Sequence, residues 1–206
     1  MMKRDVFAVG SFAVNCTVLA AGGRAWIVDP GAEPEEIVRH LGALRPEACL
    51  LTHAHFDHVG ALPELVRRFP ALKVAVTAAD RAVLTHPANQ YPPDYPPLGK
   101  ALAHAVFVEP EALAAEPGAL FPVRVIPTPG HTPGGVSYLF PGEKTLFSGD
   151  TLFAGSAGRT DLPGGDMATL LRSLERLKEL DDDVEVIPGH GPATTIGRER
   201  KVNPFW

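Results

Sequence analysis

Two spacings of hydrophobic residues alternate along this chain, and each spacing predicts one kind of element. Short apolar runs that stop at Gly, Pro or Asp predict strands. In the N-terminal half these runs are Val6–Val9, Val14–Ala20, Ala25–Val28, Ala48–Leu51 and Lys73–Val76. In the C-terminal half they are Val123–Ile126, Gly135–Phe140, Thr145–Phe147 and Val184–Ile187. The second half therefore repeats in outline the strand-rich plan of the first.

Helical spacing of apolar residues marks three further segments. The first begins near Pro34 and extends to Leu44, and the second runs from His58 to Phe69. The third begins after Asp166, its expected N-cap. Its apolar face consists of Met167, Leu170, Leu171, Leu174 and Leu177. Strands with helices on both sides predict an α/β fold, a four-layer αββα sandwich with helices outside two packed sheets.

The proline-rich segment from residue 85 to residue 99 interrupts this pattern. Proline lacks a backbone donor and forbids regular helix, so we expect a surface loop here. This loop could border a site.

The composition fits a globular protein and excludes several functional classes. The 206 residues are 45% hydrophobic and 21% charged, which fits one domain spanning residues 1–206. No apolar run is long enough to cross a membrane and the N-terminus has no signal segment, so we expect a cytoplasmic protein without membrane contact. A net charge of −5 without a Lys/Arg cluster argues against nucleic acid as a partner. Cys16 and Cys49 lie in apolar runs and are expected to be free buried thiols.

Four potential metal ligands lie within six residues directly after one apolar strand: His53, His55, Asp57 and His58. Buried polar groups cost free energy unless they are paired or coordinated, and this cluster presents several lone pairs to an ion. The alternative is a polar turn in which Asp57 or a histidine caps the helix that begins near His58.

Three further residues favour the metal site over the polar turn. His131, Asp150 and His190 each follow an apolar strand, and a glycine precedes each of them. Glycine allows close backbone approach near an ion. The remaining histidines, which are expected to have surface or packing roles, are His40, His86 and His104. Of these, His86 could face the site from the proline-rich loop.

Seven such ligands exceed the four that one tetrahedral zinc ion accepts. Two divalent ions that share a carboxylate and a water would use all seven, which predicts a binuclear centre. Nitrogen and oxygen ligands favour zinc, and iron or manganese is also compatible with them.

The pattern HxHxDH, followed by a later His, Asp and His, resembles the metallo-β-lactamase superfamily over residues 53 to 190. The resemblance implies the four-layer αββα fold and two metal sites. It assigns to the first metal His53, His55 and His131, and to the second Asp57, His58 and His190. Asp150 would bridge the two metals.

The flanking motifs resemble the short glyoxalase II type of hydroxyacylglutathione hydrolase. These motifs are DPG at 29–31, GRTDLPGGD at 158–166 and GHGPATTIGRERKVNPF at 189–205. The resemblance implies a small-molecule substrate, S-D-lactoylglutathione or a related hydroxyacyl thioester, cleaved by a metal-bridging hydroxide. Asp57 would be the catalytic residue that holds or accepts the proton of this hydroxide. A thiol has a pKa of about 8.5 and leaves as thiolate without a strong general acid.

One departure from the larger glyoxalase II enzymes concerns glutathione. Those enzymes continue into a helical region that supplies cationic contacts to the glutathione carboxylates, whereas this chain stops at Trp206. Arg159, in the loop after Asp150, is the candidate substrate-binding residue for such an anion. It could equally form a structural salt bridge or remain a solvated charge.

Other functions stay open at the level of sequence. A persulfide dioxygenase of the same fold keeps these motifs but uses one iron held by two His and one Asp. Lactonases of the superfamily are a second alternative, and a non-catalytic metal-binding protein is a third. β-Lactam cleavage is less expected, because the best-known metallo-β-lactamases have Cys where this chain has Asp150. The PGHGP and NPF motifs near the C-terminus favour the hydrolase.

Overall fold

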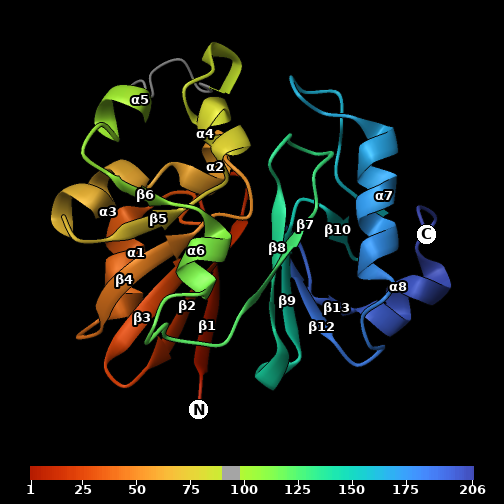
Figure 1. Cartoon of the computed structure of the whole chain (residues 1–206), viewed down its shortest axis with the longest axis horizontal. Helices are drawn as coiled ribbons and strands as arrows, with labels where there is room; N and C mark the ends of the chain where they lie inside the picture. The colour runs from red at the N-terminus through yellow and green to blue at the C-terminus, as the bar shows by residue number, and fades with distance from the viewer. Residues whose placement is uncertain (90–97) are drawn as a thin grey trace.

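Two β-sheets lie face to face in the middle of the molecule, and helices cover the outer side of each sheet (Figure 1). The computed structural model describes residues 1–89 and 98–206. The N-terminal half forms one sheet and the C-terminal half forms the other. This arrangement confirms the four-layer sandwich that the sequence predicts.

The first sheet has six strands in the order of the sequence. They are β1 (Lys3–Val9), β2 (Val14–Ala21), β3 (Arg24–Val28), β4 (Arg45–Leu50), β5 (Lys73–Ala75) and β6 (Val106–Val108). The first three strands form an antiparallel meander, and the pairs from β3 to β6 are parallel. Because parallel strands end at the same edge, the segments after β3 and β4 lie next to each other. Strand β6 was not predicted from the sequence.

The second sheet has the strand order β13-β12-β9-β8-β7. Its strands are β7 (Arg124–Pro127), β8 (Val136–Phe140), β9 (Thr145–Gly149), β12 (Glu185–Pro188) and β13 (Thr194–Thr195). A short ladder of β10 (Leu152–Phe153) and β11 (Ser156–Ala157) follows β9. Strands β9 and β12 are parallel, so the segments that follow them leave the sheet at one edge.

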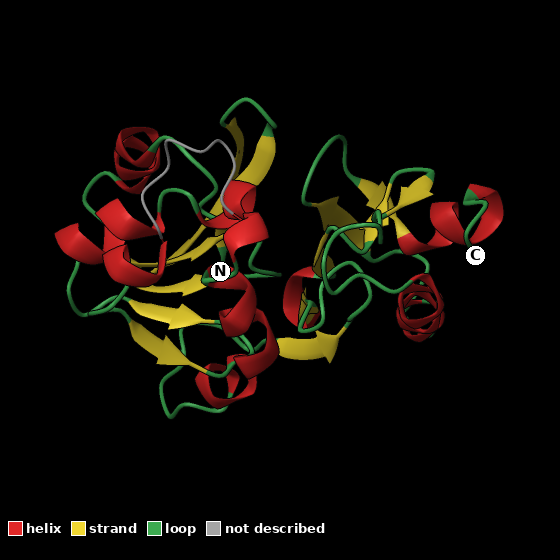
Figure 2. Ribbon diagram, turned by 90° about the horizontal axis from the view of Figure 1, so that it is seen from above, coloured by secondary structure: helices red, strands yellow, loops and turns green. Residues whose placement is uncertain are grey.

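The helices of the first half are α1 (Pro34–Leu41), α2 (Phe56–Val59), α3 (Leu62–Arg68), α4 (Ala78–Leu84), α5 (Leu98–Ala101) and α6 (Pro110–Ala114). Those of the second half are α7 (Met167–Leu177) and α8 (Ile196–Val202). The 3-10 turns are η1 (Pro87–Asn89) and η2 (Pro141–Glu143). Seen from above, the helices lie around the two sets of strands (Figure 2). In the described part of the chain, no helix is long and apolar enough to cross a membrane.

The predicted helix from His58 to Phe69 is wrong in one respect, because the structure divides it into α2 and α3. Between them, the Ala61 N–H donates to the Pro30 carbonyl at 3.0 Å, so this backbone group bonds the loop after β3. Pro63 has no backbone donor and sits in the first turn of α3, a position that suits proline. The first helix also ends early, because Gly42 adopts φ 54° after Leu41.

Three layers of apolar side chains hold the sandwich together. One layer lies between the sheets and includes Trp26, Tyr138 and Phe147, and the other two pack each sheet against its helices. On α7 the predicted apolar face is only partly buried, since Met167 and Leu171 are 41% and 40% exposed. The amphipathic spacing therefore marks a wider stripe than the sheet covers.

Two local predictions have different outcomes. Cys16 and Cys49 are free and fully buried, as predicted, and burial raises the pKa of each thiol above its usual value. The predicted proline-rich loop is only partly described, since residues 90–97 lie outside the described residues. Its described ends contain the 3-10 turn η1 and the start of α5, so regular helix enters the predicted loop at its C-terminal end.

Candidate metal centre

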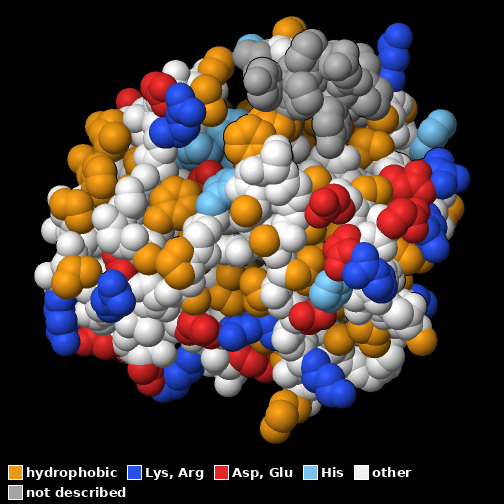
Figure 3. All heavy atoms as spheres, turned by 180° about the vertical axis from the view of Figure 1, so that it is seen from behind, with side chains coloured by type: hydrophobic (Ala, Val, Ile, Leu, Met, Phe, Trp, Pro, Cys, Tyr) orange, Lys and Arg blue, Asp and Glu red, His pale blue; other side chains and the backbone are white. Residues whose placement is uncertain are grey.

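The seven predicted ligands come together at one end of the sandwich. They follow four strands, namely β4, β7, β9 and β12. The ends of these strands supply His53, His55, Asp57, His58, His131, Asp150 and His190. In the space-filling view, histidine side chains gather around a hollow in this face (Figure 3).

One group of donors consists of His53, His55 and His131. A nitrogen of each ring lies within 4.8 Å of the other two, a spacing that could hold a metal ion. Within this group, His55 Nδ1 lies 2.8 Å from His131 Nε2.

A second group consists of Asp57, His58 and His190, whose donor atoms also lie within 4.8 Å of one another. His190 Nε2 lies 3.3 Å from Asp57 Oδ2 and 3.3 Å from His58 Nε2. Burial alone would raise the pKa of Asp57, but the hydrogen bond to His190 and the charge of His58 lower it to about 2. Asp57 is therefore ionised at neutral pH.

Asp150 lies between the two groups. Its Oδ1 is 3.4 Å from His58 Nε2, and its Oδ2 is 3.6 Å from His131 Nε2 and 3.5 Å from His190 Nε2. One carboxylate therefore reaches both groups, as a bridging ligand must.

Two buried atoms in this cluster make no hydrogen bond in the structure: His53 Nε2 and Asp150 Oδ1. An unpaired buried polar atom costs free energy, and coordination to a cation removes that cost. Burial and the neighbouring histidines lower the pKa of His53 well below its usual value, and they lower that of His55 to about 4. Neutral imidazole is the form that binds metal, so these residues fit a pair of metal ions.

The far nitrogens of three rings are held by hydrogen bonds that fix the direction of each ring. His58 Nδ1 donates to Asp29 Oδ2 at 3.0 Å, and His131 Nδ1 donates to the Arg159 carbonyl at 2.7 Å. His190 Nδ1 donates to the Phe12 carbonyl at 2.8 Å. With a metal ion bound, Nε2 of each neutral ring would be the lone-pair donor toward the cluster.

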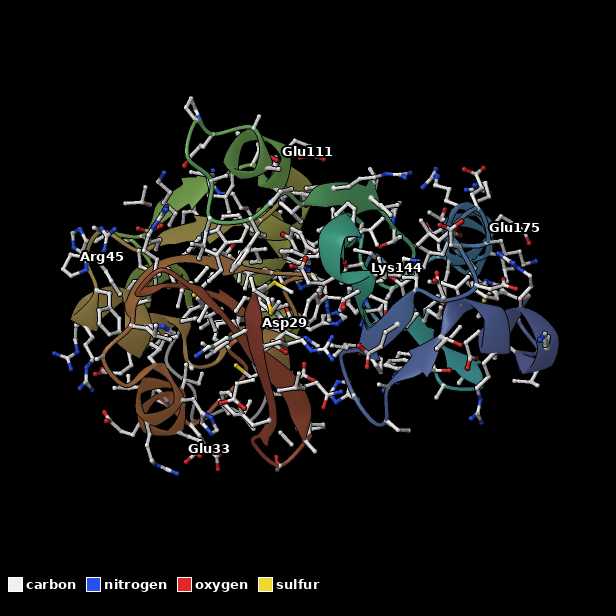
Figure 4. All side chains as sticks on the ribbon, turned by 90° about the horizontal axis from the view of Figure 1, so that it is seen from below. Asp29, Glu33, Arg45, Glu111, Lys144 and Glu175 are labelled. Carbon is white, nitrogen blue, oxygen red and sulfur yellow. The ribbon has the colours of Figure 1, made fainter. Side chains whose placement is uncertain are left out.

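Asp29, the first residue of the DPG motif, is an orienting group. It accepts hydrogen bonds from the Thr52 N–H at 2.8 Å and the Thr52 hydroxyl at 2.6 Å, besides the bond from His58. It lies near the middle of the molecule, whereas Glu33 and Glu175 lie at its edge (Figure 4). No pattern in the sequence predicts this role, because Asp29 is 23 residues away from Thr52 and 29 from His58.

Two further buried side chains hold the backbone of the ligand loop, and sequence reasoning missed both. Asp80 on α4 accepts hydrogen bonds from the Ala54 N–H, at 2.9 Å, and from the Thr132 hydroxyl, also at 2.9 Å. Asn89 in η1 donates to the Ala54 carbonyl at 2.8 Å and accepts from the Phe56 N–H at 3.0 Å. The backbone on both sides of His55 is thus fixed by the neighbouring helical segment.

Glycine before His190 is required by close packing, as the sequence predicted. A Cβ atom on Gly189 would overlap Asp150 Oδ1 and lie 2.7 Å from His58 Cε1. Only a residue without a side chain allows the backbone this close to the ligands.

A cavity of about 690 Å³ opens beside the cluster. Five of the seven ligands line it, namely His55, Asp57, His131, Asp150 and His190. The other lining residues are Phe12, Phe56, Ala79, Ala82, Val83, His86, Asn89, Pro133, Arg159, Leu162, Pro163 and Gly164. Mostly apolar walls with a few polar groups are typical of a small-molecule site.

Arg159 lines this cavity, but its guanidinium is already paired. Nε and Nη2 bond the two carboxylate oxygens of Asp161 at 2.6 and 2.7 Å, and both side chains are exposed. The structure therefore shows the salt bridge that the sequence left open, and the predicted anion contact stays a prediction.

Of the histidines outside the ligand set, His40 and His104 have the surface roles that the sequence predicted. His40 is held at the surface by Asp5 and Glu36 and stacks on Phe7, and His104 is exposed. His86 lines the cavity and so faces the site.

Comparison with known proteins identifies the family. A family model described as the Metallo-beta-lactamase superfamily matches residues 9–190. The chain therefore belongs to the metallo-beta-lactamase superfamily, a superfamily of metallo-hydrolases whose fold binds metal ions.

One relative and two solved structures are similar to this chain over nearly its whole length. The chain is 34% identical to "Hydroxyacylglutathione hydrolase GloC" of Haemophilus influenzae, over 99% of this chain and 98% of that protein. It is 36% identical to the BLEG-1 B3 metallo-beta-lactamase, with a TM-score of 0.85 and coverage of 98% and 99%. It is also 36% identical to TTHA1623 in a di-iron-bound form, with a TM-score of 0.79 and coverage of 98% and 100%.

Proposed function

We propose that this protein is a binuclear metal hydrolase that cleaves S-D-lactoylglutathione or a related hydroxyacyl thioester. The observation that carries the proposal is the convergence of two donor groups on Asp150, whose carboxylate lies within 3.6 Å of a histidine nitrogen from each group. The 34% identity with a protein named hydroxyacylglutathione hydrolase supports the thioester as substrate.

In this proposal His53, His55 and His131 would hold the first metal, Asp57, His58 and His190 would hold the second, and Asp150 would supply a carboxylate oxygen to each. We propose zinc on the basis of its nitrogen and oxygen ligands. Iron is the second candidate, because the similar TTHA1623 structure is described as di-iron-bound. When bound, two divalent ions lower the pKa of water toward neutrality and polarise a carbonyl oxygen.

The protein's own contribution is to hold the reacting groups and a proton. Asp57 is ionised and lines the cavity, so its carboxylate can accept a hydrogen bond or a proton from the attacking water. The thioester carbonyl would lie in the cavity beside His55 and Asp150. The thiol leaves as thiolate, since its pKa of about 8.5 makes protonation unnecessary.

The test combines metal quantification of the purified protein with steady-state hydrolysis of S-D-lactoylglutathione. We expect two metal ions per chain and measurable hydrolysis. Asp57→Asn should lower kcat by at least about 100-fold, in the range of a lost acid or base. Asp183→Asn is the matched control, because Asp183 is an exposed carboxylate paired with Lys144.

Three other substrates complete this experiment. Oxygen consumption with glutathione persulfide and one iron per chain would identify a dioxygenase instead. Hydrolysis of an acyl-homoserine lactone or of a β-lactam, without thioester hydrolysis, would identify a lactonase or a β-lactamase. Two bound metals and no turnover of any thioester would refute the proposal.

A further inference from the structure

Two aromatic rings stand beside the candidate metal centre. The rings of Phe12 and Phe56 pack edge to face, with centroids 5.5 Å apart and an angle of 84° between their planes. Both rings line the cavity. Phe12 is 49% exposed although it is a large apolar side chain.

Both rings are attached to backbone that also holds metal ligands. The Phe12 carbonyl accepts the hydrogen bond from His190 Nδ1 at 2.8 Å. Phe56 lies between His55 and Asp57 in the sequence, and Asn89 bonds its N–H. The backbone of each of the two aromatic residues is therefore held in position relative to the metal ligands.

The remaining described wall of the cavity continues this apolar surface. Its apolar side chains are Ala79, Ala82 and Val83 of α4, with Pro133, Leu162 and Pro163, and its polar side chains outside the ligand set are His86, Asn89 and Arg159. Orange hydrophobic side chains border the pale blue histidines in the hollow of Figure 3. Among the described residues of the wall, Arg159 is the one arginine or lysine, and Asp161 already neutralises it.

This surface suits an uncharged apolar group better than glutathione. Glutathione carries two carboxylates and one ammonium group at neutral pH, and moving charges onto an apolar wall without partners costs free energy. An apolar group gains by covering the exposed Phe12 ring and the half-buried Phe56 ring, because its contact removes apolar surface from water.

We propose that Phe12 and Phe56, with Ala82, Val83 and Leu162, form a subsite for an uncharged apolar or aromatic group next to the reacting carbonyl. The substrate class is therefore a thioester with such a group on its acyl or its thiol side, preferred over S-D-lactoylglutathione. This proposal rests on the proposed thioesterase function for its chemistry, but the subsite itself can be tested by binding.

The first experiment compares three thioesters on the metal-loaded protein. S-D-lactoylglutathione is the reference, the D-lactoyl thioester of 2-phenylethanethiol changes only the thiol, and S-phenylacetylglutathione changes only the acyl group. We expect kcat/KM to rise about tenfold for one of the two apolar substrates, and that substrate identifies the side that the subsite binds. Values below the reference for both would overturn the proposal.

The second experiment uses variants. Phe12→Ala should lower the ratio of kcat/KM between the preferred apolar substrate and the reference about tenfold. Phe205→Ala is the matched control, because Phe205 is 37% exposed and follows α8, away from the cavity lining. An unchanged ratio in Phe12→Ala, or an equal change in Phe205→Ala, would count against the subsite.

The third experiment separates the subsite from catalysis. Three thioethers that match the three thioesters, with a CH₂ group in place of the carbonyl, are titrated calorimetrically into metal-loaded protein. We expect an apolar thioether to bind more tightly than the glutathione reference, with a more negative heat-capacity change that Phe12→Ala reduces.

The outcomes distinguish the two proposals. Tight binding of an apolar thioether without turnover of any thioester would refute the thioesterase and support the subsite. Turnover of S-D-lactoylglutathione with tightest binding of the glutathione thioether would support the thioesterase and refute the subsite.

Discussion

Asn89 is the side chain whose removal tests most directly how the ligand loop is held. Its carboxamide makes two hydrogen bonds, one to the Ala54 carbonyl and one from the Phe56 N–H, and the residue is 5% exposed. In Asn89→Ala both backbone groups lose their partner. Each unsatisfied buried group costs about 1 to 3 kcal/mol, so we expect a loss of about 3 kcal/mol in the free energy of unfolding.

This loss should appear in two measurements. For a chain of this size, about 3 kcal/mol corresponds to a fall in Tm of about 6 to 12 °C. His55 lies between the two bonded backbone groups, so its ring should also lose its fixed position. Loss of an orienting contact lowers metal affinity about 10- to 100-fold, which a chelator competition titration measures.

Asn203 provides the matched control for this prediction. It is also a buried asparagine at 5% exposure, and its amide donates to the Ser156 carbonyl at 3.0 Å and to Glu199 Oε2 at 2.9 Å. Asn203→Ala should lower Tm comparably but leave metal affinity unchanged. If Asn89→Ala lowers Tm without any change in metal affinity, the reasoning about the ligand loop is refuted.

The remaining predictions concern the orienting aspartate, a close-packed glycine and the metals. Asp29→Ala removes the acceptor of the hydrogen bond from His58 Nδ1, so chelator titration should show that one metal binds about 10- to 100-fold more weakly than in the unsubstituted protein. Metal affinities unchanged from those of the unsubstituted protein would contradict this. Gly149→Ala should destabilise the protein by at least about 2 kcal/mol in urea unfolding, because Gly149 has φ +51° and a Cβ would overlap the Thr52 side chain. Gly142→Ala, where a Cβ meets nothing within 4 Å, should change stability by less than about 0.5 kcal/mol, and similar losses in both variants would argue against the packing explanation. When each metal ion is present at 100 times its Kd, its removal should lower the free energy of unfolding by about 2.7 kcal/mol per ion. An unchanged urea midpoint after chelation would refute metal binding to the folded state.

Strands and ligands could be predicted from the sequence because their signals are local. The run before His53 is apolar over consecutive residues, and the structure places β4 there. The donors themselves are rare residue types that follow strand ends, a pattern that needs no knowledge of the tertiary contacts. The same local reasoning failed between α2 and α3, where the bond from Ala61 to Pro30 depends on a distant loop.

The groups that orient the ligands could not be predicted, because nothing in their local sequence distinguishes them. In its local sequence, Asp80 is like any other carboxylate in the first turn of a helix. Asn89 is likewise like any other polar residue in a proline-rich segment. Each acquires its role from long-range contacts, across 26 residues for Asp80 and 35 for Asn89. Pairing of Arg159 with Asp161 is a local contact, yet the sequence is equally compatible with an exposed, unpaired arginine.

The placement of the ligands also explains why metal should contribute to the stability of the whole sandwich. Each donor group combines residues of both halves, since His131 joins His53 and His55 while His190 joins Asp57 and His58. The paired nitrogens are separated by 76 residues in the first group and by 132 in the second. A metal ion in either group therefore joins residues that are far apart in the sequence, and because the complete site exists only in the folded chain, its binding free energy adds to the free energy of unfolding. Metal binding should accordingly stabilise the packing of the two sheets as well as the site itself.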